Sequence, residues 1–196
     1  IPHFTVVEEV DVSKMFQFLE SSKDKGIKIT VTGYLARIIP VVLKKYPYLN
    51  ATYDEENHRY NLKKYYNMGI AVDTPDGLNV FVIENADSKN MEKISSEISE
   101  KADRARKGSL TLDEVQNSTF TITNIGGIGG IMSTPIINYP EVAILGVHRP
   151  IDVSGKKMMY LSLSCDHRLI DGAMATRFIV DLKKIIEDPD ALMSEI

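Results

Sequence analysis

The sequence has 196 residues, a length that suits one domain with a hydrophobic core of its own. A net charge of −4 argues against a nucleic-acid binder, because there is no excess of Lys and Arg to meet phosphates. The single cysteine excludes a disulfide framework and a multi-cysteine zinc site, and no apolar run is long enough for a membrane span or a signal peptide, which together predict a cytoplasmic protein with no membrane partner.

The first third of the chain combines one strand pattern with two helix patterns. The segment FTVVEEV alternates as a strand does, and a helix follows that Asp11 or Ser13 can cap. A second helix opens at Thr30 or Thr32. Pro40 lies inside its pattern and is expected to bend or shorten it.

The remainder of the chain mixes strands and helices without strict alternation. Residues 51–62 predict a hairpin, and a Pro-Asp-Gly turn joins the strands YYNMGIAVD and LNVFVIENA. A third helix starts at Asn90, three apolar strands (STFTITNI, VAILGV and MMYLSLSC) follow, and a last helix runs from Asp171 to Asp188. This order predicts one α/β or α+β domain over 1–196, a sandwich with a large, partly antiparallel sheet.

Several candidate sites have a structural explanation. The glycine run GGIGG lacks the Gly-Lys-Ser/Thr of a phosphate-binding loop and has Met132 where a dinucleotide site needs a third glycine, so it predicts a turn with close backbone approach. We expect His3, His58 and His148 to pack or to face solvent. No two histidines have metal-ligand spacing, so no metal is predicted.

The segment SLSCDHRLIDGAMATRF is different, because it places His167 between a strand end and a helix start. From periodicity alone, His167 is as consistent with a charged turn as with a general base. Asp171 is a good N-cap for the last helix whatever else it does. Cys165 can be a nucleophile paired with His167, although a lone cysteine at a strand end is more often a small buried side chain.

Residues 166–172, DHRLIDG, resemble the signature of the dihydrolipoyl acyltransferase cores of 2-oxo acid dehydrogenase complexes, which are relatives of chloramphenicol acetyltransferase. Matching segments continue in the family's order over essentially the whole chain: IPHFT, GIKIT, YYNMGIAVDTPDGL, TFTITNIGG and TPIINYPEVAILGV. The resemblance implies a chloramphenicol acetyltransferase-like two-layer sandwich with a large mixed sheet.

The resemblance also implies roles for individual residues. His167 matches the general base that takes a proton from a thiol, Thr123 matches the hydroxyl that donates to the oxyanion, and Asp171 closes the motif and supports the site's geometry. The substrates would be coenzyme A and lipoamide carried on a separate lipoyl domain, meeting where two subunits of a trimer join. Both substrates bring their own sulfur, so this chemistry leaves Cys165 to packing.

The expected assembly is a homotrimer that builds a 24-mer or a 60-mer. The family's N-terminal arm, with an arginine near the motif aspartate, is missing from this sequence, as are the lipoyl and peripheral-subunit-binding domains, so we expect a catalytic-core fragment. The decarboxylase and dihydrolipoamide dehydrogenase components would bind through those missing domains. Two alternatives stay open: a non-catalytic assembly scaffold, and a hydrolase using Cys165 and His167. The acyl group is open among acetyl, succinyl and branched-chain acyl.

Overall fold

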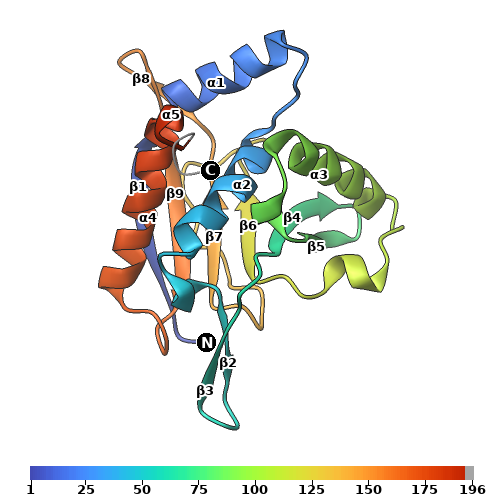
Figure 1. Ribbon diagram of the computed structural model, residues 1–196, viewed down its shortest axis with the longest axis vertical. Coiled ribbons are helices and arrows are strands. Elements are labelled where there is room, and N and C mark those ends of the chain that lie inside the picture. The colour runs from blue at the N-terminus through green and yellow to red at the C-terminus, as the bar shows by residue number, and fades with distance from the viewer. Residues whose placement is uncertain (193–196) are drawn as a thin grey trace.

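A large mixed sheet forms the centre of the chain, and the computed structural model describes residues 1–192 (Figure 1). The strand order is β1-β9-β7-β6-β4-β5, with β8 paired to the first residues of β9. Strand β6 runs parallel to β4 and β7, and the other pairings in this sheet are antiparallel. The predicted mixed sheet is confirmed. Its strands are β1 (His3–Asp11), β4 (Met68–Thr74), β5 (Gly77–Ile83), β6 (Phe120–Asn124), β7 (Ala143–Val147), β8 (Ile151–Val153) and β9 (Lys156–Asp166).

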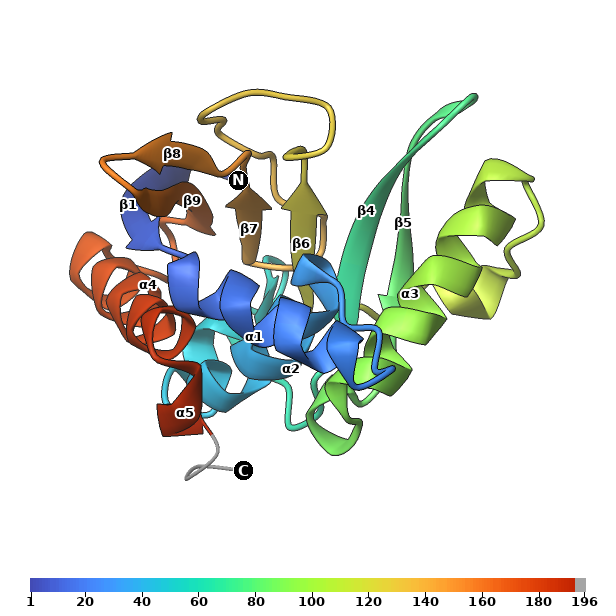
Figure 2. The ribbon, with the colours of Figure 1, turned by 90° about the horizontal axis from the view of Figure 1, so that it is seen from above.

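The helices lie on one face of this sheet, and the irregular segment 125–141 crosses the other face (Figure 2). No helix within residues 1–192 is both long enough and apolar enough to cross a membrane. The helices are α1 (Ser13–Asp24), α2 (Val31–Leu43), α3 (Met91–Arg106), α4 (Gly172–Glu187) and the short α5 (Pro189–Leu192). Single 3₁₀ turns lie at Pro47–Leu49, Ala86–Ser88 and Leu112–Val115.

Hydrogen bonds to the capping side chain confirm the predicted starts of α2 and α3. Thr30 accepts from the backbone N–H of the third residue of α2, and Asn90 does the same for α3. The start of α1 differs from the prediction. Strand β1 runs on to Asp11, Val12 becomes the N-cap, and no side chain caps the helix. The carboxylate of Asp11 instead accepts from the N–H of Ser13 at 3.0 Å.

Of the two effects expected of Pro40, bending or shortening of the helix, the shortening does not occur. The helix continues to Leu43 although Pro40 cannot donate a backbone hydrogen bond. Ile39 and Val42, on either side of Pro40, are buried in the core. Packing of the helix against the sheet therefore outweighs the lost bond.

Alternation along β9 separates an apolar face from a polar face. Leu161, Leu163 and Cys165 belong to the hydrophobic core under the helices. Ser162 and Asp166 are buried too, but alternation along the strand places them on the opposite face, the one that segment 125–141 crosses. The polar residues of the sheet therefore share the face that carries no helices.

A two-stranded hairpin, β2 (Ala51–Asp54) and β3 (Arg59–Leu62), projects from the body of the molecule (Figure 1). It confirms the hairpin predicted over residues 51–62. Both strands lie outside the large sheet and form a sheet of their own. The hairpin extends beyond the end of the sheet where β9 finishes.

Candidate active site

His167 follows the last residue of β9 and is exposed. Its backbone N–H donates to the carbonyl of Pro2 at 3.0 Å, and its ring packs on Phe4 with centroids 4.6 Å apart. Within residues 1–192, no hydrogen bond reaches its imidazole nitrogens. The imidazole is therefore placed by its backbone and by one aromatic contact, and it is open to a proton donor from outside the chain.

Asp171 is the N-cap of α4, as predicted. Its carboxylate accepts from the N–H of Met174 at 2.7 Å, and the residue is exposed. It makes no hydrogen bond to His167 within the described chain. Within one chain, Asp171 thus caps α4 and fixes the turn that follows His167.

Thr123 lies near the end of β6, far from His167. It is level with Gly146 of β7, which is in turn level with Ser162 of β9. His167 lies five residues after Ser162, one residue past the end of β9, which is roughly 16 Å at about 3.3 Å per residue. One chain alone therefore does not bring Thr123 and His167 together.

Cys165 is fully buried in the core beneath the helices. Burial, with the neighbouring Asp166 carboxylate, raises the pKa of its thiol to about 12. The strand ends at Asp166, so Cys165 and His167 do not share an accessible strand face. A buried thiol with this pKa holds no useful thiolate near neutral pH, which counts against a cysteine hydrolase.

Sequence reasoning missed the ion pair between the two residues that flank His167, the buried Asp166 and the half-buried Arg168. Asp166 is 1% exposed, and Arg168 binds it through Nη2 at 2.7 Å and Nε at 3.0 Å. Burial acts to raise the pKa of Asp166, but the hydrogen bonds and charge of Arg168 leave it lowered overall. The alternation of YLSLSC, continued one residue further, would have placed Asp166 on the polar face.

His148 is buried near Thr123, on the polar face of the sheet, and has a packing role as expected. Its Nδ1 lies 2.8 Å from the Tyr160 carbonyl, which can only accept, so Nδ1 carries the hydrogen. Nε2 lies 2.9 Å from the hydroxyl of Ser133 in segment 125–141. A Cβ on Gly146 would lie 3.2 Å from the His148 ring, so the ring occupies the space above this glycine.

The glycine run forms the predicted turn. A Cβ on Gly126 would lie 3.0 Å from the carbonyl oxygen of His148, which confirms the close backbone approach. Gly129 and Gly130 have φ values of 135° and 91°, a backbone region that favours glycine. These glycines shape the start of segment 125–141.

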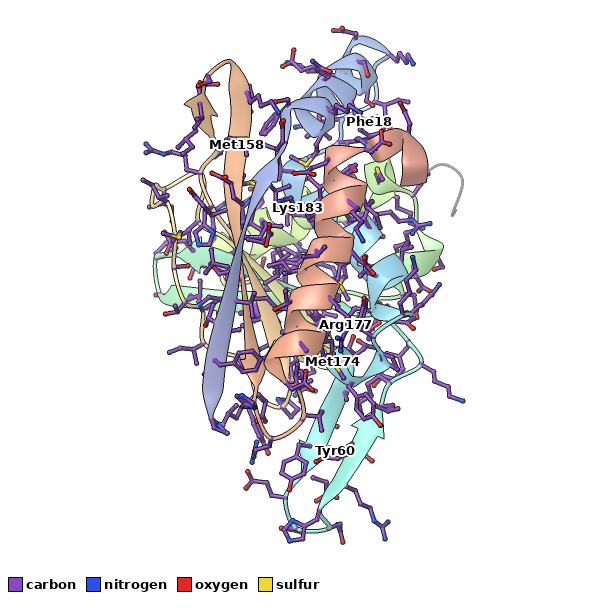
Figure 3. The ribbon with its side chains drawn as sticks, turned by 90° about the vertical axis from the view of Figure 1, so that its left-hand side faces the viewer. Phe18, Tyr60, Met158, Met174, Arg177 and Lys183 are labelled. Atoms are coloured by element: carbon purple, nitrogen blue, oxygen red, sulfur yellow. The ribbon has the colours of Figure 1, made fainter. Side chains whose placement is uncertain are left out.

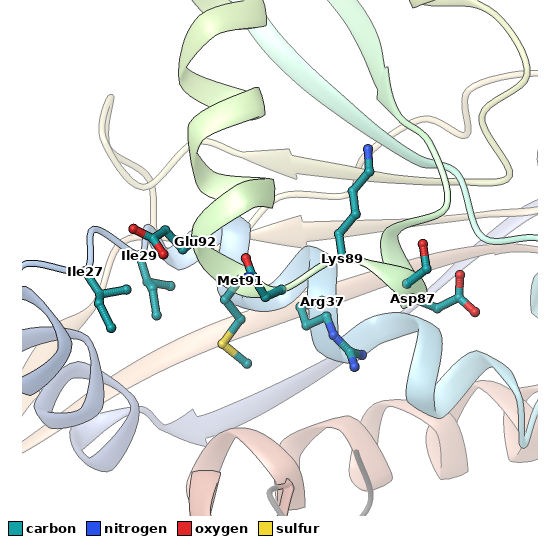
Figure 4. Close-up of a pocket in the computed structure, with 9 residues that line it drawn as sticks. Ile27, Ile29, Arg37, Asp87, Lys89, Met91 and Glu92 are labelled. Atoms are coloured by element: carbon teal, nitrogen blue, oxygen red, sulfur yellow. The ribbon is translucent and has the colours of Figure 1, made fainter.

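Two cavities in the structure lie away from His167. One, of about 420 Å³, is lined by Ile27, Ile29 and Met91 together with Arg37 and Asp87 (Figure 4). The other, of about 430 Å³, lies between α3 and strands β4 to β6. Neither His167 nor Thr123 lines either cavity. These cavities give the two residues no common pocket within one chain.

Comparison with known proteins gives one consistent family. The family described as 2-oxoacid dehydrogenases acyltransferase (catalytic domain) matches residues 1–194. The dihydrolipoyllysine-residue acetyltransferase component of the Bacillus subtilis pyruvate dehydrogenase complex is 41% identical over 99% of this chain and 47% of its own length. The Staphylococcus aureus counterpart is 42% identical over 99% of this chain and 48% of its own. This chain thus spans about half the length of the curated relatives it matches.

Solved structures agree. A truncated catalytic core of the 2-oxoacid dehydrogenase multienzyme complex from Thermoplasma acidophilum has a TM-score of 0.94 and 73% identity, covering 96% of this chain and 88% of that one. Azotobacter vinelandii dihydrolipoamide acetyltransferase gives 0.91 and 39%, covering 98% and 84%. Chloramphenicol acetyltransferase, at 15% identity and TM-score 0.64 over 95% and 87%, shows the predicted fold.

Proposed function

Because the chain belongs to the family of 2-oxoacid dehydrogenase acyltransferase catalytic domains, we propose that it moves an acyl group between dihydrolipoamide and coenzyme A. The observation that carries the proposal is His167, an exposed histidine at the end of a buried strand with no hydrogen bond to its imidazole within the described chain. The Azotobacter vinelandii structure was studied for the catalytic roles of a serine, a histidine and an asparagine, the last two four residues apart. His167 and Asp171 have that spacing, which supports the assignment.

The proposed reaction uses groups that these residue types supply. His167 takes the proton of a substrate thiol, which is mostly protonated at neutral pH. The thiolate attacks the acyl thioester carbon, and the oxyanion that forms accepts a hydrogen bond from the hydroxyl of Thr123. The intermediate then expels the other thiolate, which recovers the proton from His167. No bond to the protein forms, so Cys165 has no part in the reaction.

We propose that each active site forms between two copies of the chain. Thr123 and His167 lie too far apart to act on one thioester within a chain, so His167 of one copy would meet Thr123 of another. The symmetric oligomers that soluble proteins form bring different surfaces together in this way. A homotrimer that assembles further, to 24 or 60 copies, fits this requirement. One solved relative is the cubic core of a pyruvate dehydrogenase multienzyme complex.

The face without helices supports an interface of this kind. Segment 125–141, which crosses it, exposes large apolar side chains, among them Ile128 at 78%, Ile136 at 80% and Tyr139 at 77%. Exposed apolar residues gathered in one segment mark contact surfaces more often than free ones. A second copy packed here would remove them from water.

Acetyl is the acyl group that we favour, because both curated relatives described above are acetyltransferase components of pyruvate dehydrogenase complexes. Lipoamide would arrive on a lipoyl domain. The decarboxylase and dihydrolipoamide dehydrogenase components would be its neighbours in the complex. The role as structural core of that complex is part of the same proposal and is compatible with catalysis.

The test is a transfer assay with purified, assembled protein, coenzyme A and a panel of acyl-dihydrolipoamides: acetyl, succinyl and branched-chain. We expect acetyl to give the highest kcat/KM and His167→Ala to lose activity while retaining its assembled size. Wild-type rates in His167→Ala would refute the assigned role of His167. Assembly with no transfer for any acyl group would favour a scaffold alone.

A further inference from the structure

The projecting hairpin contacts the turn that carries His167. The guanidinium of Arg168 lies over the ring of Tyr53 at 4.6 Å, and its Nη1 forms an ion pair with the Glu55 carboxylate. The hydroxyl of Tyr60 donates to the Arg168 carbonyl at 3.4 Å. Figure 3 shows Tyr60 on the hairpin, beyond the end of α4 at which Met174 lies. Hairpin residues therefore touch both the side chain and the backbone of Arg168.

Arg168 links the hairpin to the end of β9. Its Nε and Nη2 donate to the buried Asp166 carboxylate, and its backbone N–H donates to Asp166 Oδ1 at 3.1 Å. The carbonyl of Asp166 also accepts from the N–H groups of Leu169 and Ile170 at 3.1 and 3.0 Å. Asp166 thus closes a tight turn, and Arg168 holds it closed from the hairpin side.

His167 lies between these two residues and has little else to fix it. Within residues 1–192, its hydrogen bonds and ring contacts are limited to the backbone bond to Pro2 and the ring contact with Phe4, both on the β1 side. The opposite side of the turn is held by Arg168. A change in the backbone of this turn therefore moves the imidazole directly.

We propose that the β2–β3 hairpin positions the catalytic base. Tyr53 and Glu55 hold Arg168, and Arg168 together with Asp166 fixes the backbone of the turn that carries His167. This inference rests on the proposed role of His167. Tyr53 and Glu55 are positioning residues here, because they touch Arg168 and not the reacting atoms. The hairpin is more than a hundred residues away from the motif in sequence, so only the fold reveals the relationship.

A positioning role has a measurable signature. Misplacing a catalytic group by about 1 Å can cost roughly 100-fold in rate even when the change is remote from the chemistry. Tyr53→Leu removes the aromatic face beneath the guanidinium, and we expect kcat to fall by about tenfold to 100-fold with the KM for coenzyme A nearly unchanged. Tyr53→Phe keeps the face and loses only the hydroxyl, so we expect it to restore most of kcat.

Glu55 and Glu56 provide a matched pair of exposed acids in the same hairpin turn. Glu55→Ala removes the ion pair with Arg168, whereas Glu56→Ala removes a neighbouring charge of the same sign for which the structure shows no ion pair with Arg168. We expect Glu55→Ala to lower kcat by several-fold and Glu56→Ala to leave it unchanged. Both side chains are exposed, so both variants are expected to fold and assemble.

The experiment measures kcat and KM for wild type and these variants as assembled protein, with thermal unfolding and assembled size recorded in parallel. His167→Ala is the reference. A wild-type kcat in both Tyr53→Leu and Glu55→Ala, with His167→Ala inactive, would overturn the positioning role and leave the proposed function standing. Full activity in His167→Ala would remove the proposed function itself. A fall in thermal stability with unchanged kcat would show that the hairpin only stabilises the fold.

Discussion

Thr123 and His167 lie at opposite ends of one sheet, separated by two strand pairings and by the five residue steps from Ser162 to His167. Thr123 lies near the end of β6, next to the glycine turn, and His167 lies at the other end, next to the hairpin. Each is held by its own local structure. This separation is what makes a second copy necessary for the proposed reaction, and it can be tested without a structure of the assembly.

Mixing two inactive variants should restore activity. His167→Ala chains keep Thr123, and Thr123→Ala chains keep His167, so a site formed between the two has both groups. In randomly mixed, reassembled oligomers, we expect roughly a quarter of the sites to be intact. The measurement is the transfer rate of protein denatured and refolded together, compared with the same chains refolded apart. A mixture no more active than the separate samples would place both residues in one chain's site.

Replacing Thr123 should affect the transition state more than binding. Removing a single oxyanion donor typically lowers kcat by about 100-fold to 1,000-fold, and we expect Thr123→Ala to do so with little change in KM. Thr123→Ser retains a hydroxyl and should keep most of the activity. Steady-state kinetics with varied coenzyme A separate the two parameters. An increase in KM alone would instead make Thr123 a substrate-binding residue.

The single cysteine should be dispensable for activity. Cys165 is fully buried with a thiol pKa raised to about 12, mainly by burial. We expect Cys165→Ala to keep its transfer rate while losing roughly 1 kcal/mol of unfolding free energy from a smaller core side chain. A thiol-alkylating reagent should leave the folded protein active and react only after denaturation. Inactivation of the native protein by alkylation would instead support the alternative of a hydrolase that uses Cys165 and His167.

Asp171 allows its structural and chemical roles to be separated. Asp171→Ala removes the hydrogen bond to the N–H of Met174 and should lower the unfolding free energy by about 1 kcal/mol. Asp171→Asn keeps a capping oxygen and should leave stability near wild type. If Asp171→Asn also keeps kcat, capping and turn geometry are sufficient to explain the role of Asp171. A lower kcat at unchanged stability would show that the site needs its negative charge.

Glu141 should make stability depend on pH near neutrality. It is 1% exposed; Oε1 accepts from Thr121 at 2.8 Å, while Oε2 has no partner among the described residues. Burial raises its pKa from 4.5 to about 7, against the opposing effect of the hydrogen bonds from Ser118, Thr121 and Asn138.

The direction of the effect follows from proton binding. Between about pH 4.5 and pH 7 the folded protein holds a proton on Glu141 that the unfolded chain has released. The unfolding free energy should therefore fall as pH rises through this window, by roughly 3 kcal/mol from this group. Glu141→Gln cannot titrate and should show a flatter dependence in urea unfolding at pH 5 and pH 8. Identical slopes for the two proteins would contradict the pKa shift.

Local sequence signals predicted most of the secondary structure because the forces that set it are local. Thr30, Asn90 and Asp171 each cap the helix they were expected to cap, since a side-chain oxygen reaches an N–H only two or three residues away. A local rule predicted that Pro40 bends or shortens its helix. The helix is not shortened, because the residues before and after Pro40 are buried in the core. The start of α1 was misplaced because pairing with β9 carries β1 through Asp11.

The sequence by itself determined the family, the mixed fold and the candidate residues His167, Thr123 and Asp171, because a motif and its order along the chain are properties of sequence. Only the tertiary structure decided how these residues relate in space. Strand register separates Thr123 from His167, burial encloses Cys165 in the core, and the hairpin reaches Arg168 across more than a hundred residues. Register, burial and long-range contact depend on how distant segments pack, and no local pattern encodes them.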